Sequence, residues 1–324
     1  MNEIVLSAPG KMMIAGEYAV LDGAEALVAS VDKRLFAYAR SPHSSSGSPT
    51  PSVDSADPPS LPPEALLTRQ HAEAELGPVP EMSLRIDASA LRRGDRKLGL
   101  GSSSAASAAA ASAVLAWHGE DPSTRRRDVL KWALAGHRAV APEGSGADVA
   151  AATLGGVVRF TRAAAEEATA IAWPEGLLVE VVWTGSPART SDLVRKVKAL
   201  ETSEPLRYQR AMGRLSQAAA RMISGFDTLN AASVVEAAEE HGLAMENLGN
   251  AAGAPIVEAS LARTANLARE HGGASKPSGA GGGDVALAFF ATEDRRKAFV
   301  DACPEAGLTL LSMEVGADGV RRDN

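Results

Sequence analysis

The chain has 324 residues, of which 45% are hydrophobic and 23% charged, which is typical of a globular protein long enough for two domains with their own cores. A net charge of −7 argues against a general nucleic-acid-binding protein, and the single cysteine, Cys303, excludes a disulfide framework and a thiolate metal cluster. The N-terminus lacks the basic segment of a signal peptide, and no run of about 20 strongly apolar residues occurs. We therefore expect a cytoplasmic protein with no nucleic-acid or membrane partner.

The first half of the chain alternates strand-like and helix-like segments. IVLSAPG predicts a strand that breaks at Pro9-Gly10, and residues 26–40 have the character of a second strand. Residues 41–63 contain 15 serines and prolines among 23 residues, a composition that predicts a mobile loop inserted in the domain. The elements expected next are a strand at 82–87, helices at 102–117 and 123–140, a short helix within EGSGADVAAATLGG, and a strand in GGVVRF.

The second half begins with LLVEVVWTG, residues 177–185, which predicts a buried strand ending in a glycine turn. Helical stretches are expected at 187–200, 204–224, 229–248 and about 255–271. HGGASKPSGAGGGD then predicts a glycine-rich loop, followed by a strand in DVALAFF, a helix near 293–302 and a strand near 307–315. This order predicts an α+β fold in two domains, residues 1–165 and 166–324.

A glycine-serine segment, KLGLGSSSAASAAAASAVLA, precedes and begins the helix expected at 102–117. Gly99 and Gly101 allow the backbone to approach a ligand closely, and the serines lie at a helix N-terminus, which favours an anion. The segment matches neither G-x-x-x-x-G-K-[ST] nor G-x-G-x-x-G. An alanine-rich core helix with a capped end explains this segment equally well when it is taken alone.

Three other segments combine glycines with charged residues. SAPGKMMIAGEYAVL places Lys11 after a Pro-Gly turn, although a surface lysine would fit the same pattern. GSGADVAAA places Asp148 where a helix begins, and a carboxylate there would also serve as an N-cap. ASKPSGAGGGDV has four glycines within residues 278–283, as expected for a backbone nest that binds an anion.

These four segments, in this order, strongly resemble the motifs of the GHMP small-molecule kinases, from residue 4 to about residue 290. The forms KLGLGSSSA and KPSGAGGGD, and WTGSPART after a strand, are most similar to those of the phosphomevalonate kinases. The resemblance implies an N-terminal domain like the second domain of ribosomal protein S5, a ferredoxin-like C-terminal domain and an active site between them. It also implies a monomer or homodimer.

The activity implied by the resemblance is the transfer of the ATP γ-phosphoryl group to mevalonate 5-phosphate, with Mg²⁺, to give the 5-diphosphate. Lys11 matches the family lysine at the reacting oxygens, and Asp148 matches the aspartate that acts as a base in mevalonate kinases. Because the acceptor phosphate has a second pKa near 6 and is already ionised, we expect Asp148 to orient groups more than to remove a proton.

The resemblance also assigns binding residues. The ATP phosphates are assigned to Gly99, Leu100, Gly101, Ser102, Ser103 and Ser104, with the Ser103 hydroxyl on magnesium. The acceptor is assigned to Tyr18, Ser145, Gly146, Ser278, Gly279, Ala280, Gly281, Gly282, Gly283 and Asp284, with Lys97, Arg189 and Lys276 as candidate cations.

The chain departs from the family pattern at Arg189, where members often have a serine; the arginine would bind a phosphate or indicate a different acceptor. Glu143 is a candidate carboxylate for magnesium. Mevalonate kinase or another GHMP kinase is the alternative function, and a non-catalytic binding protein is a third, although such a protein should have lost Lys11, Asp148 or the serine loop.

Overall fold

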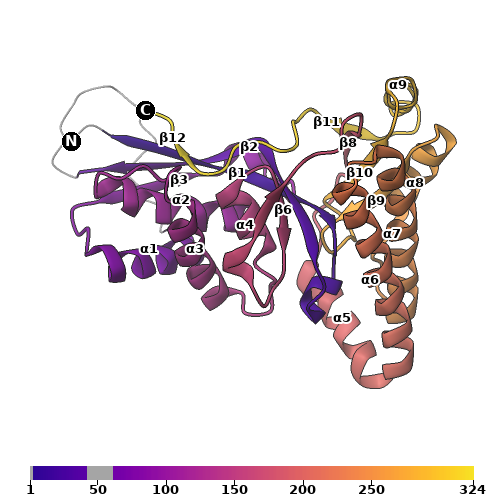
Figure 1. Ribbon diagram of the computed structural model, residues 1–324, viewed down its shortest axis with the longest axis horizontal. Coiled ribbons are helices and arrows are strands. Elements are labelled where there is room, and N and C mark those ends of the chain that lie inside the picture. The colour runs from indigo at the N-terminus through magenta and orange to yellow at the C-terminus, as the bar shows by residue number, and fades with distance from the viewer. Residues whose placement is uncertain (1–2, 42–60) are drawn as a thin grey trace.

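The computed structural model describes residues 3–41 and 61–324, which form two lobes lying side by side (Figure 1). The first lobe contains an antiparallel sheet with the strand order β12-β1-β2-β6-β7, in which β3 also pairs with β2. Its strands are β1 (Ile4–Ala15), β2 (Ala26–Arg40), β3 (Ser83–Asp87), β6 (Val157–Phe160), β7 (Thr169–Ile171) and β12 (Arg321–Arg322). Residues 42–60 of the predicted serine- and proline-rich loop lie outside the described residues.

Strand β1 does not break at Pro9-Gly10, contrary to the prediction. It pairs with β2 on both sides of this dipeptide, and the register shifts between Pro9 and Gly10 as in a β-bulge. A methyl group at Gly10 would lie 3.0 Å from the backbone oxygen of Leu100, so the glycine lets the strand approach the glycine-serine loop closely. Lys11 therefore lies within a rigid strand.

The helices of the first lobe lie on one side of its sheet (Figure 1). They are α1 (Pro63–Leu76), α2 (Ser102–Trp117), α3 (Arg126–Val140) and α4 (Ala147–Leu154). Helix α2 is buried from Ser104 to Ala116, and its alanines allow α1, α3 and the sheet to pack closely around it. The short strands β4 (Arg92–Arg93) and β5 (Arg96–Lys97) form a hairpin before it. Helix α1 was not predicted.

The second lobe has a four-stranded sheet with the order β11-β8-β10-β9. Its elements are β8 (Leu178–Trp183), α5 (Thr190–Ser203), α6 (Pro205–Asp227), α7 (Ala231–Ala252), α8 (Ala259–Glu270), β9 (Ala274–Ser278), β10 (Val285–Phe290), α9 (Glu293–Ala302) and β11 (Thr309–Leu311). This β-α-β-β-α-β arrangement, with helices α5–α8 in the first crossover, confirms the expected α+β, ferredoxin-like architecture. Residues 274–278 form a buried strand, however, and not part of a loop.

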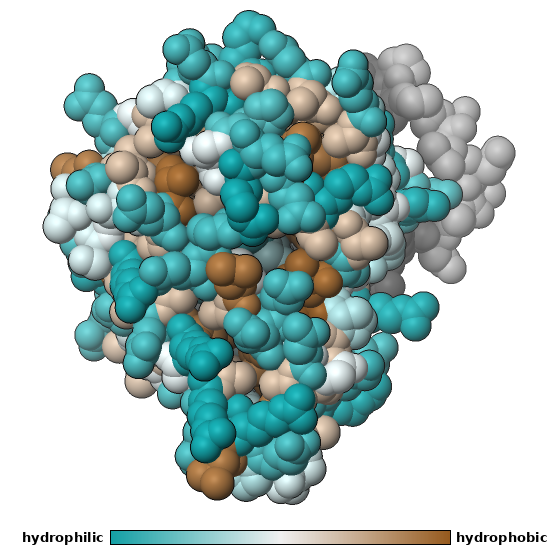
Figure 2. Space-filling model, turned by 90° about the vertical axis from the view of Figure 1, so that its right-hand side faces the viewer, coloured by the Kyte–Doolittle hydropathy of each residue, from teal (hydrophilic) through white to brown (hydrophobic). Residues whose placement is uncertain are grey.

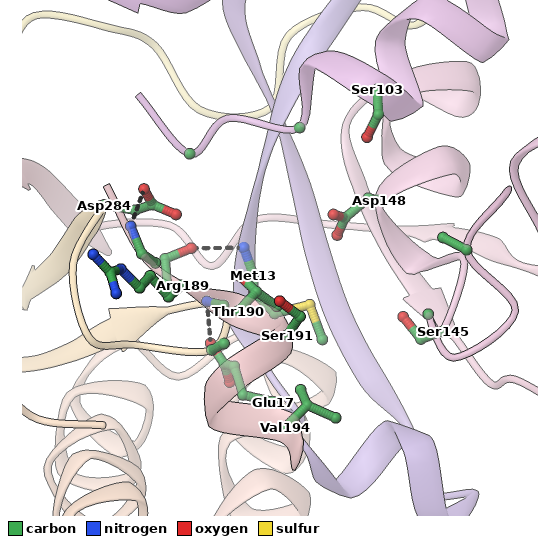
Figure 3. A pocket seen from close by; sticks show the side chains of 18 of the residues that line it. Met13, Glu17, Ser103, Ser145, Asp148, Arg189, Thr190, Ser191, Val194 and Asp284 are labelled. Atoms are coloured by element: carbon green, nitrogen blue, oxygen red, sulfur yellow. Dashed lines mark hydrogen bonds between the residues drawn. The ribbon is translucent and has the colours of Figure 1, made fainter. Parts of the chain in front are cut away.

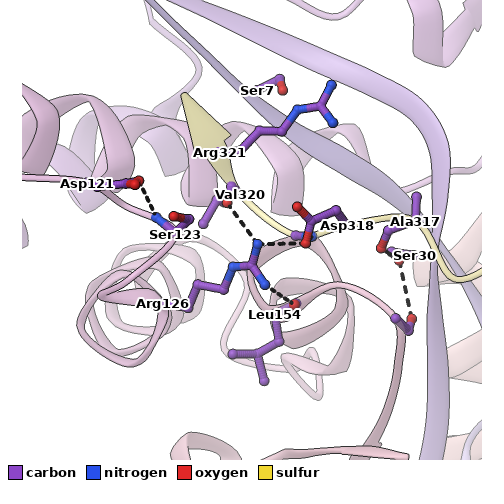
Figure 4. A network of polar contacts seen from close by, with 12 residues as sticks. Ser7, Ser30, Asp121, Ser123, Arg126, Leu154, Ala317, Asp318, Val320 and Arg321 are labelled. Atoms are coloured by element: carbon purple, nitrogen blue, oxygen red, sulfur yellow. Dashed lines mark hydrogen bonds and ion pairs between the residues drawn. The ribbon is translucent and has the colours of Figure 1, made fainter. Parts of the chain in front are cut away.

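The end of the chain returns from the second lobe to the first (Figure 1). Arg126 of α3 pairs with Asp318 at 2.6 Å and donates to the backbone oxygens of Leu154 and Val320 (Figure 4). Strand β7 also pairs with β6 of the first sheet. The first lobe therefore includes residues 169–171 and the C-terminal segment, so a boundary at residue 165 does not divide the sheets.

The face of the second lobe shown in Figure 2 is mostly hydrophilic, with hydrophobic side chains in small groups. Among the described residues, Leu206 is the most exposed of the large hydrophobic residues, at 70%. Within residues 3–41 and 61–324, no helix combines the length and the hydropathy needed to cross a bilayer.

Candidate active site

A cavity of about 990 Å³ lies between the lobes and is lined by residues of both. The predicted site residues that line it are Lys11, Tyr18, Lys97, Gly99, Leu100, Gly101, Ser102, Ser103, Ser145, Asp148, Arg189, Ser278, Gly279, Ala280 and Asp284. Ser104, Gly146, Lys276, Gly281, Gly282 and Gly283 do not line it. The fold thus brings five separate sequence segments to one cavity.

Lys11 and Asp148 form an ion pair in this cavity. The Lys11 Nζ lies 3.0 Å from Asp148 Oδ2, and the two side chains are 10% and 35% exposed. Asp148 lies in the first turn of α4, but the N-cap position is taken by Gly146 in a left-handed conformation, without a side-chain cap. Because the Asp148 carboxylate pairs with Lys11 and does not cap α4, the structure favours a role in the cavity (Figure 3).

The glycine-serine loop forms one wall of the cavity from Gly99 to Ser103. Gly99 and Gly101 have φ of 77° and 74°, a conformation that favours glycine. A methyl group at Gly101 would lie 2.8 Å from Lys11 Cγ, and one at Gly99 would overlap the Asp284 side chain. Helix α2 begins at Ser102 without a side-chain cap and at the cavity wall, an arrangement in which the first N–H groups and the helix dipole favour an anion.

Ser104, predicted to contact the ATP phosphates, does not line the cavity. Its side chain is 1% exposed, and its hydroxyl has no hydrogen-bond partner among the described residues. Ser103 does line the cavity, and its side chain lies on the same side of it as Asp148 (Figure 3). Gly146, also predicted, serves packing, since a methyl group there would lie 2.8 Å from Leu134 Cδ2.

The glycine-rich loop after β9 contributes less to the cavity than predicted. Gly282 N–H donates to the backbone oxygen of Ile256 at 2.7 Å, and a methyl group at Gly281 would overlap the same oxygen. A methyl group at Gly283 would lie 2.8 Å from both Ala188 N and the Ser186 oxygen. These three glycines therefore permit close packing within the second lobe.

The candidate cations fall into two groups. Lys97 and Arg189 line the cavity, with Arg189 at the start of α5 beside Asp284, whose carboxylate accepts from Ala188 N–H at 2.9 Å (Figure 3). Lys276, predicted to bind the acceptor, does not line the cavity. Its side chain is fully buried, and its ammonium is bound to the Glu17 carboxylate. A buried, paired lysine has no free donor for a ligand in the cavity.

Several lining residues were missed, namely Thr190, Ser191, Arg195 and Lys198 on α5. The sequence contained a signal for these four residues, because a helix begins directly after WTGSPAR, the segment that carries Arg189. Glu143 also lines the cavity, but its exposed carboxylate pairs with Lys198. Tyr18 lines the cavity with its hydroxyl committed to the Ala280 oxygen at 2.6 Å, and burial raises the pKa of that hydroxyl.

Oxygen atoms of cavity side chains suit a hard divalent cation that a bound phosphate would also coordinate. Within the described residues, no group of three or more histidine, cysteine, aspartate or glutamate side chains is placed to hold a metal. Ser103 supplies a hydroxyl and Asp148 a carboxylate on the same cavity side. Mg²⁺ typically takes one or two protein oxygens and completes its shell with phosphates and water, so this donor set fits it.

The chain is similar to proteins of one family. Residues 66–156 match the GHMP kinases N terminal domain, and residues 230–308 match the GHMP kinases C terminal domain. A phosphomevalonate kinase of Streptomyces sp. (strain CL190) is 28% identical over 90% of this chain and 91% of that protein. A mevalonate kinase of Aeropyrum pernix is 30% identical over 60% of this chain and 61% of that protein.

A solved structure shares the fold. The phosphomevalonate kinase of Streptococcus pneumoniae, in complex with phosphomevalonate and AMPPNP, superposes with a TM-score of 0.78 at 21% identity, over 96% of this chain and 99% of that chain. The superposition therefore includes both lobes.

Proposed function

The chain belongs to the GHMP kinases, and on this premise we propose that it transfers the γ-phosphoryl group of ATP to the phosphate of mevalonate 5-phosphate. The bond between the γ-phosphorus and the β-phosphate oxygen breaks, a bond to an acceptor phosphate oxygen forms, and ADP and the 5-diphosphate leave. The observation that carries the proposal is the Lys11–Asp148 pair, at 3.0 Å, beside the glycine-serine loop in the cavity.

The residues of the first lobe would bind ATP. The N–H groups of Gly99, Gly101 and the start of α2 would cradle the phosphates, because they face the cavity with a positive partial charge. Mg²⁺, held by Ser103 and by Asp148 or the phosphates, would neutralise the charge on the phosphate oxygens when bound. The protein contributes chiefly position and a fixed charge, as expected for phosphoryl transfer.

Lys11 would stabilise the charge that develops on the transferred group. Its Nζ is fixed by the ion pair with Asp148, and its stem packs beside Gly101, so little reorganisation is needed during reaction. An acceptor phosphate is already ionised near neutral pH, so Asp148 is not required as a base and would orient Lys11 and the acceptor.

The second lobe, with Lys97 of the first, would bind the acceptor. Arg189 and Lys97 are cavity cations suited to an acceptor that carries a phosphate, and Ser278 and Gly279 line the same cavity. The similarity to a phosphomevalonate kinase over 90% of this chain supports this assignment.

Mevalonate is the alternative acceptor. In that reaction a hydroxyl must lose its proton, and Asp148, with its carboxylate in the cavity, would serve as the base. The similarity to mevalonate kinases keeps this alternative open.

A panel of acceptors tests the proposal. ADP release is measured with ATP, Mg²⁺ and, in turn, mevalonate, mevalonate 5-phosphate, homoserine or galactose. We expect turnover with mevalonate 5-phosphate, whereas turnover with mevalonate alone would establish the alternative. ATP binding without turnover of any acceptor would favour a binding protein.

A further inference from the structure

A buried ion pair joins the two lobes at the cavity, where Glu17 is one of the lining residues. The Lys276 ammonium, on β9, is bound to the Glu17 carboxylate of the first lobe, and the two side chains are 0% and 1% exposed. The same ammonium donates to the backbone oxygens of Met13, at 3.3 Å, and Pro277, at 2.7 Å. One buried cation thus has partners in both lobes.

Glu17 also contacts the cavity wall formed by residues 278–280. Gly279 N–H donates to Glu17 Oε1 at 3.4 Å (Figure 3). The residues on either side are held by the same segment: Met13 N–H donates to Ser278 Oγ at 2.8 Å, and the Tyr18 hydroxyl donates to the Ala280 oxygen. Three consecutive wall residues are therefore fixed by residues 13–18.

The same first-lobe segment carries Lys11, to which the proposed function assigns the stabilisation of charge. Lys11 and Met13 lie in β1, and Lys11 N–H also donates to the Leu100 oxygen of the glycine-serine loop at 2.9 Å. The two walls of the cavity are thus connected through one strand. A shift of β9 relative to β1 would change the distance between Lys11 and the wall at 278–280.

The cluster is completed by a neutral histidine. His241 of α7 is fully buried, and its Nε2 accepts from Gly16 N–H at 3.2 Å and lies 3.4 Å from Glu17 Oε2. Burial lowers the pKa of His241 well below its usual value, and the nearby Lys276 lowers it further. Burial raises the pKa of Glu17 and lowers that of Lys276, and each of the two groups opposes the shift of the other.

A buried ion pair is weak evidence for stability, because desolvation of two charges offsets much of their attraction. Its directional contacts do specify one arrangement of the groups that it joins. We propose that the Glu17–Lys276 pair is a positioning device that sets the cavity wall at residues 278–280 relative to Lys11. This inference rests on the proposed kinase function and assigns to neither residue a contact with the reacting atoms.

The test compares two substitutions of Glu17. Glu17→Asp keeps the charge but shortens the side chain, so its carboxylate cannot reach Lys276 and Gly279 together. Because displacements of about 1 Å can cost about 10²-fold, we expect kcat to fall at least about tenfold, with the KM for ATP changed less than about threefold. Glu17→Gln keeps the length and an acceptor oxygen but leaves the buried Lys276 ammonium without a counter-charge, so kcat is compared per folded molecule, with a melting curve for each variant. On that basis its loss in kcat should be clearly smaller. An equal or larger loss for Glu17→Gln would overturn the proposal.

A second readout does not depend on the acceptor. Hydrogen–deuterium exchange should become faster at residues 278–284 in Glu17→Asp and stay unchanged in α2. Unchanged exchange at 278–284 would refute the inference, even if the enzyme proves inactive with every acceptor. An inactive wild type whose loop responds as expected would instead refute only the proposed function.

Two further variants complete the test: one is a matched control, and the other replaces Glu17→Asp if that variant does not fold. Ser275→Ala alters a buried hydroxyl of the same strand that has no hydrogen-bond partner among the described residues, and it should leave kcat and exchange unchanged. If Glu17→Asp does not fold, Ser278→Ala removes the bond to Met13 N–H and carries the test. It should raise exchange at 278–284 and lower kcat by about threefold or more, since one positioning hydrogen bond is lost; no change in either would overturn the proposal.

Discussion

The two glycine-rich loops at the cavity have similar compositions but different roles. From Gly99 to Ser103 every residue of the first loop lines the cavity. In the second loop, Ser278, Gly279, Ala280 and Asp284 line it, while the glycines at 281–283 pack against Ile256 and residues 186–188. A run of glycines therefore identifies an unusual backbone path, but not what lies beside it.

Backbone conformation does not distinguish these loops. Gly101 and Gly281 both have φ of 74°. They differ in what a side chain would meet, which is the Lys11 side chain at Gly101 and the Ile256 backbone at Gly281. The first loop uses glycine to admit a functional group, and the second uses it to admit another part of the fold.

The largest effect should come from removing the cation beside the first loop. Lys11→Met should lower kcat by about 10³-fold or more, because the substituted side chain cannot neutralise charge on the transferred group. ATP affinity, measured by calorimetry, should stay within about fivefold of wild type, since backbone N–H groups of the loop would still bind the phosphates. Turnover near the wild-type rate would show that Lys11 is not the charge stabiliser.

Gly101→Ala tests the first loop itself. The new methyl group would lie 2.8 Å from Lys11 Cγ in a backbone conformation unfavourable for alanine, so it should displace Lys11. We expect kcat to fall by about 10²-fold, as for other displacements of a catalytic group. A steady-state assay with a melting curve separates this from unfolding, and a kcat within threefold of wild type would contradict the geometry.

Arg189→Ser tests whether the start of α5, beside the end of the second loop at Asp284, faces the acceptor. Arg189 lines the cavity next to the Ala188–Asp284 hydrogen bond. Loss of a charged contact to a phosphate should raise the acceptor KM by about tenfold, and the ATP KM much less. Equal changes in both constants, from initial rates at varied ATP and acceptor, would remove this assignment.

Gly281→Ala should affect stability more than activity. The methyl group would overlap the Ile256 backbone and impose a positive φ on alanine, at a cost of about 2–3 kcal/mol in the free energy of unfolding. The kcat of the folded fraction should remain within about threefold of wild type, because Gly281 does not line the cavity. Urea unfolding and a kinetic assay measure the two quantities, and a loss of kcat like that of Gly101→Ala would make the loops equivalent.

The smallest effect should be the pH dependence of the free energy of unfolding that comes from His241, which lies among the buried contacts that hold the second loop. His241 has a folded-state pKa well below its usual 6.5, so below pH 6.5 the unfolded chain binds a proton that the folded protein does not. The free energy of unfolding should therefore fall as pH decreases from 7 to 5, with a slope from this residue of at most about 1.4 kcal/mol per pH unit. His241→Gln should make this dependence shallower in urea unfolding at several pH values; an unchanged slope would mean that His241 is protonated when folded.

Local sequence patterns predicted much of the molecule. The helices α2, α3 and α5–α9 lie close to their predicted ranges, because apolar periodicity and terminal glycine or proline are local signals. The motif residues Lys11, Asp148 and Gly99–Ser103 were all expected at the cavity, where the structure brings them together.

Pairing and burial were decided only by the tertiary structure. Strand β1 continues through Pro9-Gly10 because β2 pairs with both sides of a bulge, and residues 313–324 join the first lobe because Arg126 and β1 bind them. Lys276 resembled a ligand-binding lysine, but Glu17, 259 residues away in sequence, neutralises it in the interior. The sequence alone determines which residue types can serve each role, whereas the neighbours that desolvate or pair them come from distant parts of the chain.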